Sequence, residues 1–302
     1  MEENVASISK VTQDVKEYYT DNWTKIANCY ELDSDGIPLD SAWYRRKIYN
    51  KYLSLFRPES VIDIGCGGGQ TVLDALNLGL DVKGYEPISD LVDFGRNKLV
   101  DANYDSAFIQ LGDASVLESV SESSVDSVAL LSVIPHIPIE DWAELHSQIY
   151  KVLKSSGTAI IAYRNELFDL FTANRFTVEF FMNNFFTNNH YSNTHRVKLQ
   201  TELGLMIPNY DKPDKNFTES QDKRFGQLNR PKCNPLTINR YLATFGFEIE
   251  GTYFCNFHSK LPLMIPNELT DKFIKHNLEL DLSESWQGNF MASMFLVVVS
   301  KP

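Results

Sequence analysis

The chain has 302 residues and a net charge of −12, and 43% of its residues are hydrophobic, which is enough apolar material for the packed core of one large domain. The acidic balance argues against polyanions and anionic lipid surfaces, so we expect neither a nucleic acid nor a membrane as a partner, although a local basic patch can sit inside an acidic total. No segment has the apolar length of a membrane span, and the four cysteines form no CxxC pair, so we expect a cytoplasmic protein with free thiols and no metal site.

Residues 1–57 are predicted to form an N-terminal helical cap. Two stretches, VTQDVKEYY (11–19) and AWYRRKIYNKYLSLF (42–56), repeat apolar or aromatic residues at helical spacing. Pro58 then ends the second helix, because proline cannot continue the helical hydrogen-bond ladder.

Residues 58–163 alternate between short apolar strands and helices. Strands are predicted at SVIDI (60–64), LDVKGYE (80–86), DSAFIQLGD (105–113), SVDSVALLSVI (124–134) and TAIIAY (158–163). Helices are predicted at GGQTVLDALNLG (68–79, ended by Gly79), ISDLVDFGRNKLV (88–100) and IPIEDWAELHSQIYKVLK (137–154, ended by Gly157). This rhythm predicts an α/β fold with a doubly wound, mostly parallel sheet covered on both faces.

The alternation breaks over residues 164–232 and resumes over 233–302. The first segment has no clear strand, and we predict a mainly helical lid insertion, because a connection this long inside a compact domain is usually functional. Its seven phenylalanines between 168 and 186 are interpreted as the core of the lid, with a cage around a ligand as the alternative. The second segment completes the core sheet, with a helix at PLTINRYLATFGF (235–247) and strands at FEIEGTYFCNF (247–257) and FMASMFLVVV (290–299).

Four glycines follow the first predicted strand in VIDIGCGGG (61–69), which marks a sharp turn or a close approach of the backbone to a ligand. Dinucleotide-binding proteins place GxGxxG here, but Gln70 occupies the position of the third glycine. The pattern Asp-x-Gly-x-Gly-x-Gly instead resembles motif I of the class I S-adenosylmethionine-dependent methyltransferases. The resemblance implies a Rossmann-like fold in which Asp63, Gly65, Cys66, Gly67 and Gly69 form the cofactor turn, with Cys66 as a small residue tolerated there.

Two further acids stand where this family places them. Glu86 ends the second strand and is implied to accept hydrogen bonds from both ribose hydroxyls, a feature that NAD enzymes share. Asp113 follows the third strand and is implied to accept from the adenine amino group, while the N–H of Ala114 meets the ring. Pro87, next to Glu86, and Ser132, in the fourth motif, are assigned to the cofactor on the same resemblance.

Other segments resemble the family in order along the chain. SVDSVALLSVIPHI (124–137) is similar to the fourth motif, VLKSSGTAII (152–161) to the segment usually written LKPGG, and FGFEIEG (245–251) to the glycine-phenylalanine pair before the last strands. Ser155 and Ser156 depart from Pro-Gly. The resemblance also implies that the N-terminal segment folds over the cofactor, with Tyr19 near the methionyl group and Arg45 on its carboxylate; both are ordinary helix residues in the alternative interpretation.

The predicted function is therefore methyl transfer from S-adenosylmethionine to an oxygen or nitrogen atom of a small-molecule acceptor. His136 follows the fourth strand, at the edge where open α/β sheets bind ligands, and is our candidate for a catalytic base. Its alternative role is to shape the pocket wall. An NAD-dependent oxidoreductase and a non-catalytic methyltransferase-like binding module are the competing functions, and the sequence gives no indication of the oligomeric state.

Overall fold

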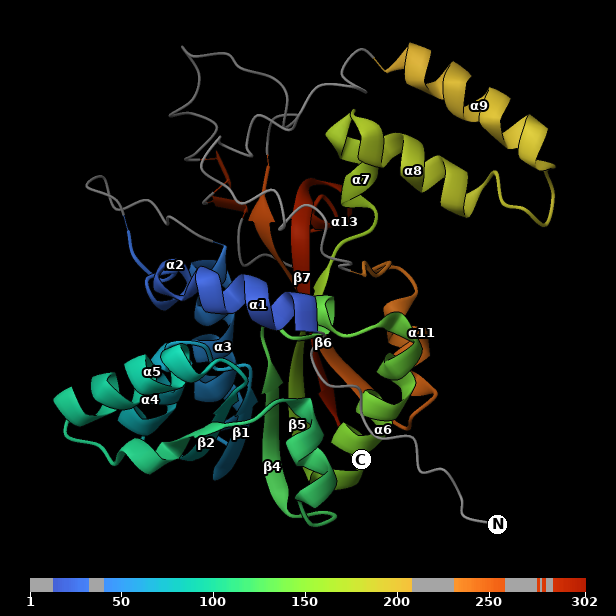
Figure 1. Cartoon of the computed structure of the whole chain (residues 1–302). Coiled ribbons are helices and arrows are strands. Elements are labelled where there is room, and N and C mark those ends of the chain that lie inside the picture. Colours follow the sequence, from blue (N-terminus) through green and yellow to red (C-terminus); the bar gives the residue numbers. More distant parts are fainter. Residues whose placement is uncertain (1–12, 33–40, 208–230, 259–275, 278, 281–284) are drawn as a thin grey trace, which may run out of the picture.

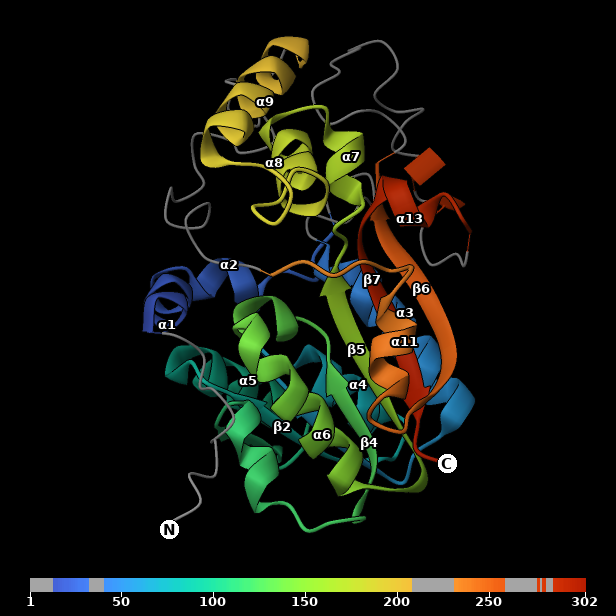
Figure 2. The same cartoon turned by 90° about the vertical axis from the view of Figure 1, so that its right-hand side faces the viewer.

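The computed structural model describes residues 13–32, 41–207, 231–258, 276–277, 279–280 and 285–302. Seven strands of this described part form one sheet in the order β3-β2-β1-β4-β5-β7-β6 (Figures 1 and 2). The strand bounds are β1 Ser60–Ile64, β2 Asp81–Glu86, β3 Ile109–Leu111, β4 Val125–Leu130, β5 Leu153–Arg164, β6 Glu248–Phe257 and β7 Ala292–Ser300. β7 runs antiparallel to both of its neighbours, and the remaining pairs are parallel, so the predicted mostly parallel sheet is confirmed.

Helices cover both faces of the sheet. One face packs on α3 (Ala42–Phe56), α4 (Gln70–Asn77) and α5 (Ser89–Asp101), and the other on α6 (Trp142–Val152), α11 (Ile238–Ala243) and the short 3₁₀ turn η2 (Ala114–Ser119). In Figure 1 the first group lies to the left of the sheet and the second to the right. The doubly wound arrangement leaves only the ends of the strands open to a ligand.

Several predicted element bounds differ from the structure. The strand expected at 124–134 ends at Leu130, and residues 290–291 of the last expected strand belong to a short helix that ends at Met291. The expected strand at 105–113 is reduced to the three residues of β3, because residues 106–108 form a 3₁₀ turn that the side chain of Asp105 caps. The expected helix at 137–154 ends at Val152 instead of at Gly157. Residues 153–157 belong to β5, where Leu153 pairs with Val125 of β4, so this strand is longer than its apolar run indicated.

The cap contains α1 (Gln13–Asp21) and α2 (Trp23–Ala27) in addition to α3. A small apolar cluster joins α2 to the core, where Ala27 packs against Ile88 and Leu91. α3 is tied to the sheet from the other side, since the buried hydroxyl of Tyr52 is 2.6 Å from the side-chain oxygens of both Ser127 on β4 and Thr158 on β5. Residues 1–12 and 33–40 of the predicted cap lie outside the described residues.

The insertion is helical where it is described, with α7 (Phe168–Thr172), α8 (Arg175–Asn184) and α9 (Asn193–Met206) above the strand ends (Figure 2). Phenylalanine rings pack on one another within α7 and within α8, and none of the described ones lines the ligand cavity, which agrees with a lid core. The buried Asn165 side chain, at the base of the lid, donates hydrogen bonds to backbone carbonyls around α13 (Gly288–Met291). Residues 208–230 of the predicted insertion lie outside the described residues.

Two glycines with the same backbone conformation differ in how tightly they are packed. Gly69 and Gly79 both have a left-handed backbone, with φ of +76° and +78°. An added Cβ at Gly69 would lie 2.5 Å from Ile109 Cδ1 and 3.2 Å from Gly95 Cα, whereas at Gly79 it would meet nothing within 4 Å. We expect Gly79→Ala to cost about 1 kcal/mol of unfolding free energy, from backbone strain alone. Gly69→Ala should cost a further ~1–3 kcal/mol through overpacking.

Urea denaturation of both variants measures the difference, with Gly79→Ala as the matched control. Equal losses in the two proteins would show that the β1–α4 turn is not packed as described.

Candidate active site

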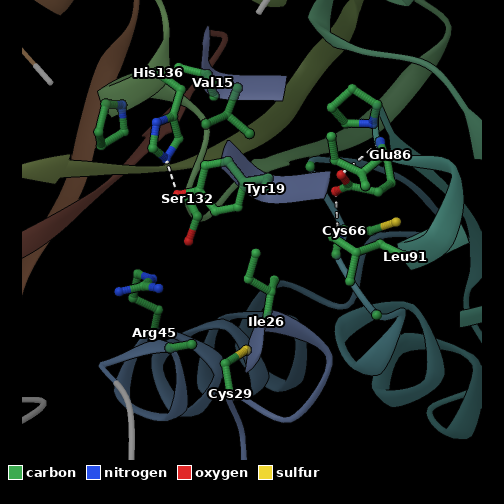
Figure 3. A pocket seen from close by; sticks show the side chains of 18 of the residues that line it. Val15, Tyr19, Ile26, Cys29, Arg45, Cys66, Glu86, Leu91, Ser132 and His136 are labelled. Carbon is green, nitrogen blue, oxygen red and sulfur yellow. Dashed lines mark hydrogen bonds between the residues drawn. The ribbon is translucent and has the colours of Figure 1, made fainter. Parts of the chain in front are cut away.

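A cavity of about 520 Å³ opens at the carboxyl ends of β1, β2, β4 and β5. Its other walls come from α1, α2 and α3 of the cap and from the neighbouring parts of β6 and β7. This volume is in the usual range for sites that bind a small molecule or cofactor. Figure 3 shows part of the lining, with Glu86 and Arg45 on opposite sides of the space.

The glycine turn forms the floor of this cavity. Gly65 and Gly67 have φ of +70° and +55°, in the left-handed region that favours glycine. A Cβ on Gly65 would come within 2.5 Å of Val133 Cγ2, so the close approach of the loop after β4 excludes a side chain there. These two glycines of the turn therefore line the cavity with backbone and place no side chain of their own between it and a ligand.

Glu86 is fixed before any ligand arrives. Its Oε2 accepts a hydrogen bond of 3.0 Å from the N–H of Gly67, and its Oε1 accepts one of 3.1 Å from the N–H of Ile88. Each carboxylate oxygen can accept a second bond, so both remain able to receive a hydroxyl. Only 6% of this residue is exposed. Burial raises the pKa of Glu86 from its usual 4.5 to about 7, although the two backbone bonds lower it.

Asp113 begins the turn η2. Its Oδ1 accepts from the N–H and the hydroxyl of Ser115, at 3.1 and 2.6 Å, and its Oδ2 lies 3.8 Å from Nζ of Lys16 on α1. The carboxylate is thereby oriented by its own turn, while a lysine of the cap approaches from the other side. Ala114 lines the cavity next to it.

His136 and Tyr19 meet across the cavity wall. A hydrogen bond of 2.8 Å joins the Tyr19 hydroxyl to Nε2 of His136, and the two rings pack edge to face with centroids 5.0 Å apart. The hydrogen bond occupies Nε2 in this structure. The role of His136 as a base stays a prediction.

Arg45 reaches the cavity from α3. Its Nη1 donates to the hydroxyl of Ser41 at 2.9 Å and to the sulfur of Met294 on β7 at 3.0 Å. Arg45 is 8% exposed, and no carboxylate of the described residues lies within ion-pair distance of it. Since a buried guanidinium is most stable opposite an oxyanion, it fits the carboxylate that the resemblance assigned to it.

Most of the predicted cofactor residues come together in this cavity. Ten of the twelve line it, as does His136: Tyr19, Arg45, Gly65, Cys66, Gly67, Glu86, Pro87, Asp113, Ala114 and Ser132. Cys66 is only 3% exposed, and burial raises the pKa of its thiol well above the usual value, so it acts as a neutral packing group.

Two predicted cofactor residues are placed differently. Asp63 is 1% exposed and lies behind the glycine turn, where it accepts a hydrogen bond from the hydroxyl of Thr71 on α4; burial raises its pKa to about 7. Gly69 starts α4 and packs against Gly95 and Ile109. Neither lines the cavity, so both shape the turn from behind. The spacing of a sequence motif does not distinguish residues that line the cavity from residues that support the turn behind it.

Sequence reasoning missed several lining residues. Ile88 and Leu91 form an apolar wall beside Glu86, and their position directly after that acid could have suggested it. Arg164 ends the apolar run of β5. A single charged residue at the carboxyl end of a buried strand could also have been predicted to line the cavity. Asn256 and Ser293 gave no signal, because nothing local relates them to the site.

Comparisons with known proteins agree with this geometry. Residues 62–161 match the family model described as a methyltransferase domain. The chain is 27% identical over 113 residues to the tRNA N(3)-methylcytidine methyltransferase trm140 of Schizosaccharomyces pombe, a match over 35% of this chain. That match spans 36% of the relative, or about a third of its length.

Two solved structures can be aligned with most of this chain. One is described as a complex between the Haloferax volcanii Trm112 methyltransferase activator and a putative methyltransferase, with a TM-score of 0.53 at 14% identity over 95% of this chain and 97% of that chain. The other is a putative S-adenosylmethionine-dependent methyltransferase from Listeria monocytogenes, with a TM-score of 0.48 at 19% identity over 86% of this chain and 98% of that one.

The sheet order, the glycine turn with its two acids and the domain match lead to one class of protein. Residues 62–161 form a methyltransferase domain, the protein is an S-adenosylmethionine-dependent methyltransferase, and S-adenosylmethionine is its cofactor. The structural likeness itself shows the fold alone, and the cofactor assignment rests on the site and the domain. The alternative of an NAD-dependent oxidoreductase is not supported.

The expected partners need a correction. We predicted a small-molecule acceptor and no nucleic acid, and the similarity to a tRNA methyltransferase contradicts this. The prediction was wrong because a net charge of −12 averages over unlike segments. Residues 164–232 contain ten lysines and arginines against eight aspartates and glutamates, so the insertion carries +2 and the rest of the chain −14.

Within the described part, no helix is both long and apolar enough to cross a bilayer.

Cofactor affinity should depend on pH through Glu86. The pKa of about 7 means that the folded protein holds a proton on this carboxyl at lower pH, and this proton competes with the ribose hydroxyls for the oxygens. We expect the affinity for S-adenosylhomocysteine to rise about tenfold per pH unit below pH 7 and to level off above it. Calorimetry between pH 5.5 and 8.5 measures this, and Glu86→Gln should remove the dependence. The assignment of Glu86 fails if the variant keeps the wild-type profile.

The same shift predicts how stability changes without a cofactor. Between pH 4.5 and about 7 the folded protein binds a proton that the unfolded chain has released, so the unfolding free energy contributed by Glu86 falls as the pH rises through this interval.

Arg45 can be tested with a ligand that lacks the amino-acid end of the cofactor. Arg45→Met should weaken S-adenosylhomocysteine by roughly 1.5–3 kcal/mol, the usual contribution of hydrogen bonds to charged groups. Binding of 5′-methylthioadenosine, which has no carboxylate, should be unchanged. Equal losses for the two ligands, measured by calorimetry, would place Arg45 in a purely structural role.

Proposed function

We propose that this protein transfers a methyl group from S-adenosylmethionine to a ring nitrogen of a base in tRNA. The observation that carries the methyl-transfer part is the cavity itself, which places fixed carboxylates at one end and arginines at the other. The similarity to a tRNA methyltransferase and the local positive charge of the insertion support the choice of acceptor.

Each group of residues has a distinct task in this function. When bound, S-adenosylmethionine supplies a methyl group that its positively charged sulfur has already activated. Glu86 and Asp113 hold the adenosine end, and Arg45 holds the carboxylate. Tyr19, from the cap, excludes water from the space between them. The protein thus contributes position and a dry site, and it does not have to create an electrophile.

The acceptor atom sets what else the residues must do. A ring nitrogen such as N3 of cytidine carries a lone pair, so no proton has to be removed before the transfer. His136 is then needed to shape the wall and to hold Tyr19, and its role as a base is dispensable. The base itself must leave its stack to enter a cavity of this size, as is usual for enzymes that modify bases.

The lid is the best-placed surface for the remainder of the RNA. β5 ends at Arg164 and leads directly into α7, so the lid leaves the sheet at the mouth of the cavity. None of the described residues of α9 is buried. Arg196 on this helix is half-buried and its guanidinium donates to the carbonyl of Phe186 and to Oδ1 of Asn188, whereas Lys198 is exposed. Exposed basic side chains of this kind bind phosphates without reading the sequence.

A single charge reversal on α9 tests this surface. Lys198→Glu should raise the KM for tRNA by roughly tenfold at low salt, because it removes a cation that contacts phosphate and places a negative charge there. The affinity for S-adenosylhomocysteine should not change. Lys83→Glu, the same reversal on the exposed side of β2, is the matched control. The measurement is transfer of a labelled methyl group to total tRNA, followed by mass spectrometry of the nucleosides.

The outcomes separate the candidate functions. Methylated bases in tRNA from the wild-type protein, with a weaker KM in Lys198→Glu only, support the proposal. Cofactor binding without transfer to any tRNA would contradict it and favour the non-catalytic binding module.

A further inference from the structure

Three polar residues gather where β5, β7 and β6 lie side by side. Arg164 is the last residue of β5, Ser293 is the second of β7, and Asn256 is the last but one of β6. All three line the cavity. In the sheet order, β1 and β4 separate β2 from β5, so this group lies about 14 Å or more from Glu86, at three strand spacings of ~4.8 Å.

The backbone is bent to bring two of these side chains together. Asn256 has φ of +57°, a left-handed conformation that is uncommon for residues other than glycine and is tolerated best by asparagine and aspartate. The ladder pairs Cys255 with Met294 and Phe257 with Ala292, and between these pairs the Nδ2 of Asn256 donates to the hydroxyl of Ser293 at 2.5 Å. Strained backbone of this type clusters at binding sites, where the surrounding structure holds it in place.

Arg164 supplies the charge of this group. It pairs in register with Met294, whose sulfur accepts from Arg45, so the two arginines approach the same end of the cavity from different elements. Burial lowers the pKa of Arg164 and the nearby carboxylate of Asp169, which is itself paired with Lys232, raises it; the guanidinium remains charged at neutral pH. Its planar fork of donors matches the oxygens of a phosphate better than any other side chain does.

S-Adenosylmethionine has one carboxylate, which Arg45 is placed to bind from α3. Arg164 is the register partner of Met294 on β7, and Asn256 and Ser293 line the cavity where β6 pairs with β7. A second anion that enters beside the cofactor would meet these three side chains first.

We propose that Arg164, Asn256 and Ser293 form an anion subsite that binds the phosphate attached to the nucleoside that is methylated. This inference rests on the proposed RNA acceptor and names the contact that positions it. The phosphate fixes the distance between the base and the sulfur, and the lid binds the rest of the chain.

The test uses the full-length protein saturated with S-adenosylhomocysteine and calorimetric titration with three small probes. Cytidine 5′-monophosphate should bind about tenfold more tightly than cytidine, because only the former offers a charged acceptor to Arg164. Ribose 5-phosphate should compete with it. Arg164→Met should abolish the preference for the phosphate, Arg164→Lys should keep part of it, and Asn256→Ala should reduce it. Arg240→Met, an exposed arginine on α11, is the matched control.

The results distinguish this subsite from the function on which it rests. Suppose that ribose 5-phosphate binds, that Arg164→Met weakens its binding, and that the cytosine base of cytidine or cytidine 5′-monophosphate adds no affinity. The phosphate subsite is then supported, and cytidine as the acceptor is contradicted. If no phosphate compound binds more tightly than its neutral counterpart, the subsite is refuted. It is also refuted if Arg164→Met weakens S-adenosylhomocysteine and leaves the phosphate preference intact. Should Arg164→Met not fold, Arg164→Lys and Asn256→Ala give the same comparison.

Discussion

The carboxylate of Glu86 organises the cofactor end of this protein. It accepts one backbone N–H from the glycine turn after β1 and one from the segment after β2, so a single buried group joins the two loops that a nucleoside must contact. A carboxylate in such a place is costly without partners, and the raised pKa of Glu86 shows that its two bonds offset the burial only in part. The incoming ribose hydroxyls would complete the set of hydrogen bonds. Cofactor binding and the charge of this residue are therefore linked.

Around this contact the cavity is assembled from segments far apart in the chain. α1 and α3 bring Tyr19 and Arg45, the β-strands bring the acids, and β6 and β7 close the far wall. The charges are sorted along the cavity, with carboxylates near β2 and guanidiniums near α3 and β5. A ligand with a neutral, hydroxyl-rich end and an anionic end is oriented by this arrangement before any contact is fully formed.

The net charge of the whole chain is a poor guide to whether this protein can bind a nucleic acid. Net charge controls long-range attraction only when the charge is spread evenly, because interactions beyond roughly 10 Å are screened at ordinary salt. Here the excess of acids lies outside the insertion, and α9, which has no buried residue, presents the exposed Lys198. A local surface can thus attract a polyanion although the whole chain repels it.

The sheet, the glycine turn and the acids at the strand ends could all be predicted from the amino-acid pattern. Such features depend on local periodicity and on the rule that parallel strands share one carboxyl edge, so Glu86 and Asp113 could be placed without a structure. The folded chain was needed to see that Asp63 supports the turn from behind, and that Arg164, Asn256 and Ser293 line the same cavity. The last three are far apart in sequence, and they converge because β7 inserts antiparallel between β5 and β6, a pairing that no local pattern encodes.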